Sequence, residues 1–337
     1  MANLTTGYLG LQLKNPVIAG ASNLVKDVDN CKRMEAAGAA AIVYKTLFEE
    51  QVELERLQMS EELNQYNERH AEMISLFPDI EHAGPREHLA HLRKVVNSVN
   101  IPVIASLNCT FDETWVEYAK ELESTGINAL ELNFYAVPGD FKRESKSIIN
   151  EQMDVISEVK KSVKIPVSVK LSPYYTNTLM VVQNMYYAGV DGFVLFNRLF
   201  QPDIDIEKEA HHFPYSISHD DDGRLSLRYL GLLHGEIRGS LCGNSGIFTG
   251  KDVVKMILAG ADAVQVVSTL YKNGIDQISV ILKEVEQWME RKNYQTINDF
   301  KGKLSKKNMK DPFAYKRAQY IDILMKSEEI FIKYPMR

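Results

Sequence analysis

The sequence predicts an α/β fold, a (β/α)8 barrel in which eight parallel strands alternate with helices. Three observations favour it: a recurring glycine phrase at helix ends, apolar runs introduced by proline, and helix-period segments between them. The 337 residues can hold a barrel of roughly 250 residues plus excursions. An open doubly wound sheet is the alternative, but no G-x-G-x-x-G motif follows the first expected strand.

The glycine phrase identifies four of the expected strands. In each case a glycine follows a helical stretch, where a left-handed C-cap is typical, and a short apolar run begins soon after. Three further runs start with Pro16, Pro102 or Pro166, since proline is tolerated at the first residue of a strand. A fourth run lacks proline but falls in the matching interval. The expected strands cover about 17–21, 41–45, 103–107, 129–133, 167–171, 192–196, 239–242 and 263–267.

Helix-period segments such as 152–163 and 251–258 fill most intervals, which indicates a parallel sheet with right-handed crossovers. We expect one TIM-barrel domain over 1–302, followed by a mostly helical tail over 303–337. Excursions at about 47–88 and 198–238 follow strand ends, so they belong on the face where barrel enzymes carry their active sites. The charged helical stretch at 49–72 is either a lid or partner surface, or a solvated elaboration.

Composition and charge narrow the functional classes. The net charge of −6 and the isoelectric point of about 5.8 argue against nucleic acid or an anionic membrane as the main partner. Cys31, Cys109 and Cys242 lie far apart, so neither a disulfide framework nor a metal site is indicated. No run of about 18 apolar residues and no signal-peptide pattern occurs. We therefore expect a cytoplasmic protein that neither spans nor binds a membrane.

Polar side chains gather at the ends of the expected strands, where they point into the mouth of a barrel. Packing alone does not explain two lysines and three amides in one cavity, because a buried charge without a partner is costly. The pattern therefore favours a site that receives an anion, although either lysine alone could extend to solvent. The set comprises Lys45, Thr46, Asn108, Asn133, Lys170, Asn197 and Ser268.

The loop after the seventh expected strand favours phosphate binding. It reads Gly-Asn-Ser-Gly-Ile over 243–247 and leads into a helix near Gly250. Small residues let main-chain N–H groups approach a phosphate, and barrels commonly bind phosphate with the loops after strands 7 and 8. Ser268 and Thr269 supply the second loop. A phosphorylated cofactor or a phosphorylated small substrate fits this pattern.

With these motifs in place, the chain resembles the dihydroorotate dehydrogenases, nearest the soluble class 1 type, over about residues 3–302. The resemblance implies an FMN cofactor at the barrel mouth, a small-molecule substrate and a homodimer. Six phrases carry it, in order: NPVIAGAS (15–22), YKT (44–46), ELN (131–133), VKLSPY (169–174), CGNSGI (242–247) and AGADAVQV (259–266).

The resemblance also implies individual roles. Ala21 and Ser22 would lie against the flavin, and Lys170 would face its N1/O2 edge, where a cation stabilises the reduced form. The loops after the last two strands would hold the phosphate through main-chain amides. The expected catalytic set is Lys45, Asn133, Tyr135 and Asn197, of which Tyr135 rests on its place after the fourth strand and not on the resemblance. The implied cofactor-binding set is Ala21, Ser22, Lys45, Thr46, Asn108, Asn133, Lys170, Asn197, Gly243, Ser245, Gly246, Val267 and Ser268.

One departure from the family concerns catalysis. The family reads Asn-x-Ser-Cys-Pro-Asn after strand 4, with the cysteine (or a serine) as acid/base, whereas residues 133–139 read Asn-Phe-Tyr-Ala-Val-Pro-Gly. Tyr135 is the nearest replacement, either as a proton donor or as packing beside the cofactor. Cys109, just past the third strand, either reaches the barrel mouth or is a small buried thiol, and we expect the second. The substrate-binding Asn-Gly phrase has no counterpart in 47–88. Ser245 and Val267 replace glycines, which main-chain binding tolerates.

Three functions follow as hypotheses. The first is an FMN-dependent oxidoreductase that transfers hydride between the flavin and a small pyrimidine-like or unsaturated substrate. The second is an FMN-binding protein without catalysis that acts as a binding or regulatory module. The third is a flavin-free phosphosugar-type lyase or isomerase that uses Lys45 or Lys170 as a Schiff-base amine.

Overall fold

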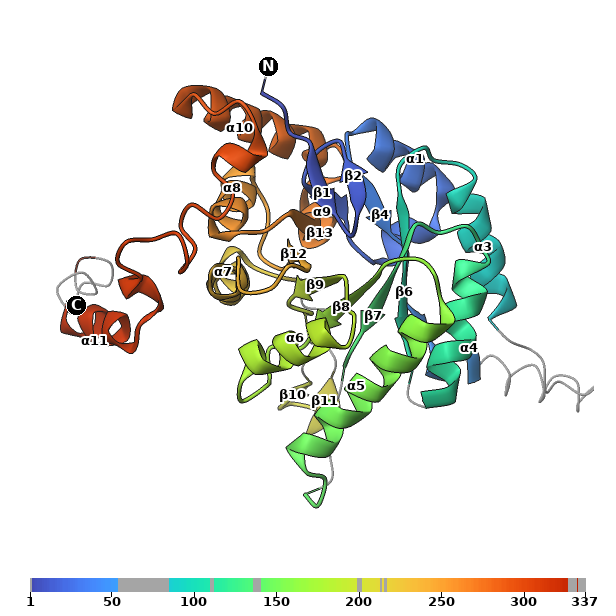
Figure 1. The fold of residues 1–337 in the computed structure, drawn as a ribbon. Coiled ribbons are helices and arrows are strands. Elements are labelled where there is room, and N and C mark those ends of the chain that lie inside the picture. The colour runs from blue at the N-terminus through green and yellow to red at the C-terminus, as the bar shows by residue number, and fades with distance from the viewer. Residues whose placement is uncertain are drawn as a thin grey trace, which may run out of the picture.

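The computed structural model describes residues 2–53, 85–109, 112–135, 141–198, 202–212, 214, 217–326 and 332. It confirms the predicted barrel (Figure 1). Each barrel strand pairs in parallel with the next, and pairing of Val264 with Val17 closes the sheet. The barrel strands are β3 (Val17–Ala19), β4 (Ala41–Val43), β6 (Val103–Asn108), β7 (Ala129–Asn133), β8 (Val167–Leu171), β9 (Gly192–Leu195), β12 (Ser240–Gly243) and β13 (Ala263–Val266).

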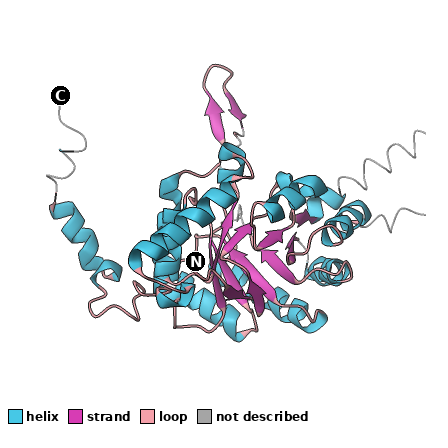
Figure 2. Ribbon diagram, turned by 90° about the horizontal axis from the view of Figure 1, so that it is seen from above, coloured by secondary structure: helices cyan, strands magenta, loops and turns pink. Residues whose placement is uncertain are grey.

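Helices surround this barrel, as the view from above shows (Figure 2). Four of the glycines in the repeated phrase, Gly38, Gly126, Gly189 and Gly260, have positive φ, so the expected helix-end turns are present. The helices around the barrel are α1 (Val28–Ala36), α3 (Arg86–Val96), α4 (Asp112–Glu123), α5 (Ser145–Ser162), α6 (Thr178–Tyr187), α7 (Gly223–Leu233), α8 (Gly250–Ala259), α9 (Ser268–Asn273) and α10 (Gln277–Lys292).

The prolines before three of the strands take part in the sheet only as acceptors. The carbonyls of Pro16, Pro102 and Pro166 accept hydrogen bonds from neighbouring strands at 2.8, 3.0 and 2.9 Å. Because proline has no N–H, it fits here, where the strand enters the sheet and no donor is required. Most barrel strands are buried along their whole length, which explains why they appear in the sequence as short apolar runs.

A short antiparallel hairpin, β1 (Thr6–Tyr8) with β2 (Leu11–Leu13), closes the end of the barrel at which the strands begin. The Leu9 N–H donates to Ser240 Oγ at 3.0 Å, and the Leu9 side chain lies against Gly192. The sequence does not predict this hairpin, because its strands have only three residues each. With this end closed, the opposite end, where the strands finish, remains for a site.

The two excursions and the tail lie outside the barrel. In the first, β5 (Leu47–Phe48) pairs with β6 and residues 49–53 are helical; the remainder of the expected helix over 49–72 lies outside the described residues. The second contains a hairpin that stands away from the body (Figure 2), formed by β10 (Asp203–Asp205) and β11 (Ala210–His212). The sequence does not predict this exposed polar hairpin, which has no apolar alternation.

The tail begins with turns over 301–312, and only then come a 3-10 turn, η5 (Phe313–Tyr315), and α11 (Arg317–Met325). The expected mostly helical tail is thus seen only in its second half, up to residue 326. Within the described part of the chain, no helix combines the length and apolar character needed to cross a membrane.

Candidate active site

Two adjoining cavities lie where the barrel strands end. One, of about 130 Å³, is surrounded by the loops after β12 and β13; the other, of about 330 Å³, faces the loops after β3, β4 and β7. The two cavities share one wall and are together called the cleft; four residues line both: Ala21, Lys170, Asn197 and Arg198. The larger cavity is also lined by Ser22, Asn23, Lys45, Thr46, Phe48, Asn133 and Tyr135. The smaller cavity is also lined by Ile217, Ser218, Asn244, Ser245, Gly246, Ile247, Gln265, Val267 and Ser268.

Lys45 and Lys170, the two lysines that the sequence places at strand ends, both line the larger cavity. Lys45 follows β4 and Lys170 belongs to β8, and the barrel brings these two positions together because all its strands end at one rim. Asn133 is the register partner of Lys170 in the pairing of β7 with β8. The expected convergence of cations and amides on one cavity is therefore present in the structure.

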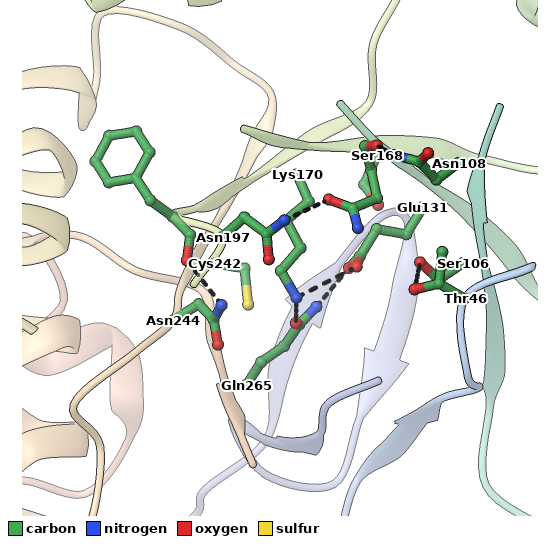
Figure 3. Close-up of polar contacts among 12 residues, drawn as sticks. Thr46, Ser106, Asn108, Glu131, Ser168, Lys170, Asn197, Cys242, Asn244 and Gln265 are labelled. Carbon is green, nitrogen blue, oxygen red and sulfur yellow. Dashed lines mark hydrogen bonds and ion pairs between the residues drawn. The ribbon is translucent and has the colours of Figure 1, made fainter. Parts of the chain in front are cut away.

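Lys170 is not an isolated cation (Figure 3). Its ammonium group donates to Gln265 Oε1 at 3.2 Å and lies 3.7 Å from Glu131 Oε1. Gln265 in turn donates from Nε2 to Glu131 Oε2 at 2.5 Å. The three side chains come from β7, β8 and β13 and are almost completely buried. This pairing explains how the barrel tolerates a buried lysine.

A set of amides fixes the rim between the two cavities. Asn197 donates from Nδ2 to Asn133 Oδ1 at 3.0 Å, and Asn108 donates from Nδ2 to the Asn133 carbonyl at 2.6 Å. Asn244 donates to the carbonyl of Phe196 at 2.8 Å. Asn133 and Asn197 thus face the cleft in a fixed orientation, while Asn108 lines neither cavity and supports Asn133 from the side.

The loop after β12 takes an unusual backbone conformation. Ser245 and Gly246 have φ values of +67° and +66°, in the left-handed region. The Gly246 N–H donates to Ser218 Oγ at 3.3 Å, and Ser218 Oγ donates to Ser268 Oγ at 2.7 Å. Gly243 lies outside the cavity, whereas Ser245, Gly246, Val267 and Ser268 line it. The narrow end of the cleft is therefore built from main-chain groups and hydroxyls of both expected loops.

The sequence alone did not point to four residues of this site: Glu131, Gln265, Arg198 and Ser218. Arg198 lines both cavities and a third, outer cavity of about 170 Å³ beside Tyr174. Its guanidinium group is paired with the Asp222 carboxylate, which also caps the 3-10 turn η3 (Asp220–Asp222). The Asp222 carboxylate thus fixes the position of the Arg198 guanidinium group at the outer edge of the cleft.

Comparison with known families identifies the family to which this chain belongs. A family model described as dihydroorotate dehydrogenase matches residues 3–289, which is most of the chain. The chain belongs to the dihydroorotate dehydrogenase family. The resemblance in the sequence is thereby confirmed, and it supports an oxidoreductase.

Three relatives are similar to this chain along almost their whole length. A dihydroorotate dehydrogenase B (NAD(+)) catalytic subunit from Methanocaldococcus jannaschii is 26% identical over 304 residues, which cover 86% of this chain and 94% of the relative. The corresponding subunit from Thermoplasma volcanium is 26% identical over 308 residues, covering 90% and 98%. A dihydroorotate dehydrogenase A (fumarate) from Lactobacillus delbrueckii subsp. bulgaricus is 24% identical over 323 residues, covering 90% and 99%.

The position of the usual acid/base in this dihydroorotate dehydrogenase family member falls largely outside the described residues, which stop at Tyr135 and resume at 141. Tyr135 lines the larger cavity and is 42% exposed. Cys109 lines neither cavity of the cleft; burial, followed by the charges of Glu49 and Glu50, raises the pKa of its thiol. Cys109 is therefore held in the neutral thiol form, which is a poor base. The described residues contain no cluster of side chains suited to hold a metal ion.

Gly246→Ala tests the backbone strain in the loop after β12. A Cβ at Gly246 would lie 2.3 Å from the Gly223 nitrogen and 2.9 Å from the His219 carbonyl oxygen, and φ is +66°. We expect the variant to lose about 1–3 kcal/mol of unfolding free energy from backbone strain, and more if the backbone atoms cannot move. Ser245→Gly, at a matching φ of +67°, is the control and should be neutral or slightly stabilising. Urea unfolding of both variants checks this; equal losses would contradict it.

His88, beside the cleft, gives stability a pH dependence. Burial, followed by the charges of Lys45 and Lys26, lowers the pKa of its imidazole from 6.5 to about 4, and its ring packs edge-on to Tyr44. Because the folded-state pKa is depressed, stability is complete above pH 6.5 and is lost as the pH falls towards 4, by on the order of 1–3 kcal/mol. Urea unfolding at pH 7.5 and pH 5 should show this loss for the wild type and less of it for His88→Phe, which cannot titrate.

Proposed function

We propose that the protein is an FMN-dependent oxidoreductase that transfers hydride between the flavin and a small pyrimidine-like or unsaturated substrate. The observation that carries the proposal is the pair of adjoining cavities, which give the cleft two chemically different ends. Its narrow end is made of main-chain groups and hydroxyls, and its wide end is made of cations and amides. A phosphate fits the first and a polar ring system fits the second.

The residues present fit FMN. Ser245, Gly246, Val267 and Ser268 would hold the phosphate, together with the hydroxyl of Ser218. At the wide end, the Ser22 hydroxyl is buried and has no hydrogen-bond partner among the described residues, which a polar ligand edge would supply. Ala21 and Thr46 line the same wall, as the family resemblance implies.

The junction of the two ends carries the ring chemistry. Lys170 lines both cavities, so it would meet the N1/O2 edge of the ring system. FMN, when bound, supplies the hydride acceptor and donor, while Lys170 stabilises negative charge on the reduced ring. The fixed amides of Asn133 and Asn197 would orient the ring and the substrate beside it.

Two cationic side chains line the substrate end, Lys45 and Arg198. Arg198 is held by Asp222 from outside the larger cavity, and no carboxylate lines that cavity among the described residues. We therefore propose a planar substrate with an anionic group, held by these cations. Tyr135 would hold the proton that reaches or leaves the substrate carbon. Lys170, paired with Glu131, is poorly suited to the Schiff-base role, because an ammonium group held against a carboxylate is not a nucleophile.

Redox assays test the proposed activity. The protein is saturated with FMN, photoreduced without oxygen, and mixed with orotate, fumarate or a quinone. Reoxidation by one of these acceptors in catalytic turnover supports the oxidoreductase. Tight FMN binding without turnover, with every acceptor and with dihydroorotate as donor, would instead support the non-catalytic binding protein. The homodimer and the cytoplasmic location stay predictions.

A further inference from the structure

Glu131, Lys170 and Gln265 form a closed triangle of contacts under the cleft (Figure 3). Glu131 is 1%, Gln265 1% and Lys170 6% exposed, so water does not screen the charges effectively. Lys170 and Gln265 line the smaller cavity, whereas Glu131 lines neither cavity. Glu131 thus makes no direct contact with a ligand in the cleft, whereas its two neighbours can.

The orientation of the Gln265 amide suits a charged Lys170 on one side and a charged Glu131 on the other. Its oxygen accepts from the Lys170 ammonium group, and its NH₂ group donates to the Glu131 carboxylate. A flipped amide would set NH₂ against the ammonium group and the carbonyl oxygen against the carboxylate, which is repulsive on both sides. The geometry therefore fits an ionised Glu131 whose charge compensates that of Lys170.

Other ionisable groups near the triangle do not replace Glu131 as the compensating anion. Burial and the charge of Glu131 raise the pKa values of Cys242 and Tyr8, which keeps both neutral. The Asp262 carboxylate is engaged elsewhere, by Lys301 at 2.8 Å and the Leu241 N–H at 2.8 Å. Among the described residues, Glu131 alone contributes a carboxylate to the contacts of Lys170.

We propose that Glu131 is a positioning residue that lowers the reduction potential of the bound flavin by compensating the charge of Lys170. This inference rests on the proposed function. An uncompensated cation at the N1/O2 edge would favour the negatively charged reduced flavin strongly. A carboxylate 3.7 Å from that cation cancels part of its field and also holds the ammonium group in place.

The decisive variant is Glu131→Gln, which keeps the shape of the side chain and removes its charge. We expect the ratio of its affinities for reduced and oxidised FMN to rise at least about tenfold over that of the wild type. For a two-electron couple, this change raises the reduction potential by about 30 mV. Redox titration of the reconstituted protein against a reference dye measures the shift. Ser168→Ala is the control, because Ser168 is buried in the same barrel interior on β8 but carries no charge. The reduction potential of FMN bound to this variant should equal that of the wild type.

If Glu131→Gln does not fold, a second comparison carries the same test. Glu131→Asp keeps the carboxylate but draws it back from Lys170 by one methylene group, so the potential should rise in the same direction by a smaller amount. An unchanged or lower potential in whichever of the two variants folds overturns the proposal while FMN binding stands. Failure of the wild type to bind FMN overturns the proposed function as well, so the two failures are distinguishable.

Discussion

Lys170→Met is expected to lower the free energy of unfolding by about 3–5 kcal/mol, because it leaves the Glu131 carboxylate buried without its ammonium partner. Glu131 is 1% exposed and would retain only the Gln265 amide. The same variant should lose most of its FMN on gel filtration, since the cation at the junction of the two cavities is gone. Urea unfolding and the flavin-to-protein absorbance ratio measure the two effects.

The double variant Lys170→Met/Glu131→Gln separates these effects. Replacing both members of a buried pair with neutral side chains is often close to neutral for stability. The double variant should therefore recover most of the lost unfolding free energy but should not recover normal FMN retention. A Lys170→Met protein as stable as the wild type would show that Glu131 and Lys170 are not a charged pair.

Tyr135→Phe is expected to slow substrate turnover by about 10²–10⁴-fold, the typical contribution of a positioned proton donor or acceptor. Tyr135 lines the larger cavity with Asn133 and Asn197, and in the described residues no carboxylate, histidine or cysteine lines that cavity. The substitution removes only the hydroxyl, so FMN binding should not change. Single-turnover reoxidation of the photoreduced protein by its active acceptor measures the chemical step.

Tyr174→Phe is the matched control for Tyr135. Tyr174 also follows a barrel strand, but it is 74% exposed and lines the outer cavity rather than the cleft. Its loss of a hydroxyl should leave the rate unchanged. If Tyr135→Phe retains the rate to within about threefold, the hydroxyl is not the proton donor, and Tyr135 packs beside the cofactor instead.

The barrel could be predicted because its physical constraints produce recognisable patterns in the local sequence. Parallel strands buried on both faces need continuous apolar runs, and helix ends with positive φ favour glycine. The hairpin β1–β2 leaves no such mark, because Leu9 and Tyr8 are buried by contacts with strands far along the chain. Long-range packing of short segments is not visible in a local pattern.

The site was predictable to the extent that its residues stand at strand ends. Glu131 and Gln265 lie two residues before Asn133 and Val267, and side chains two apart on a strand point to the same side. That spacing was a usable signal for both. Arg198 and Ser218 offer no equivalent, because they lie in an excursion whose path over the cleft is set by tertiary contacts such as that of Ser218 with Ser268.

The proposed function requires that the cleft at the strand ends binds FMN. The most direct measurement is the absorption spectrum of the purified protein after incubation with excess FMN and gel filtration. We expect a yellow protein with one FMN per chain, and loss of that FMN from Lys170→Met. A colourless wild-type protein that cannot be reconstituted, or one that retains FMN equally well without Lys170, would contradict it.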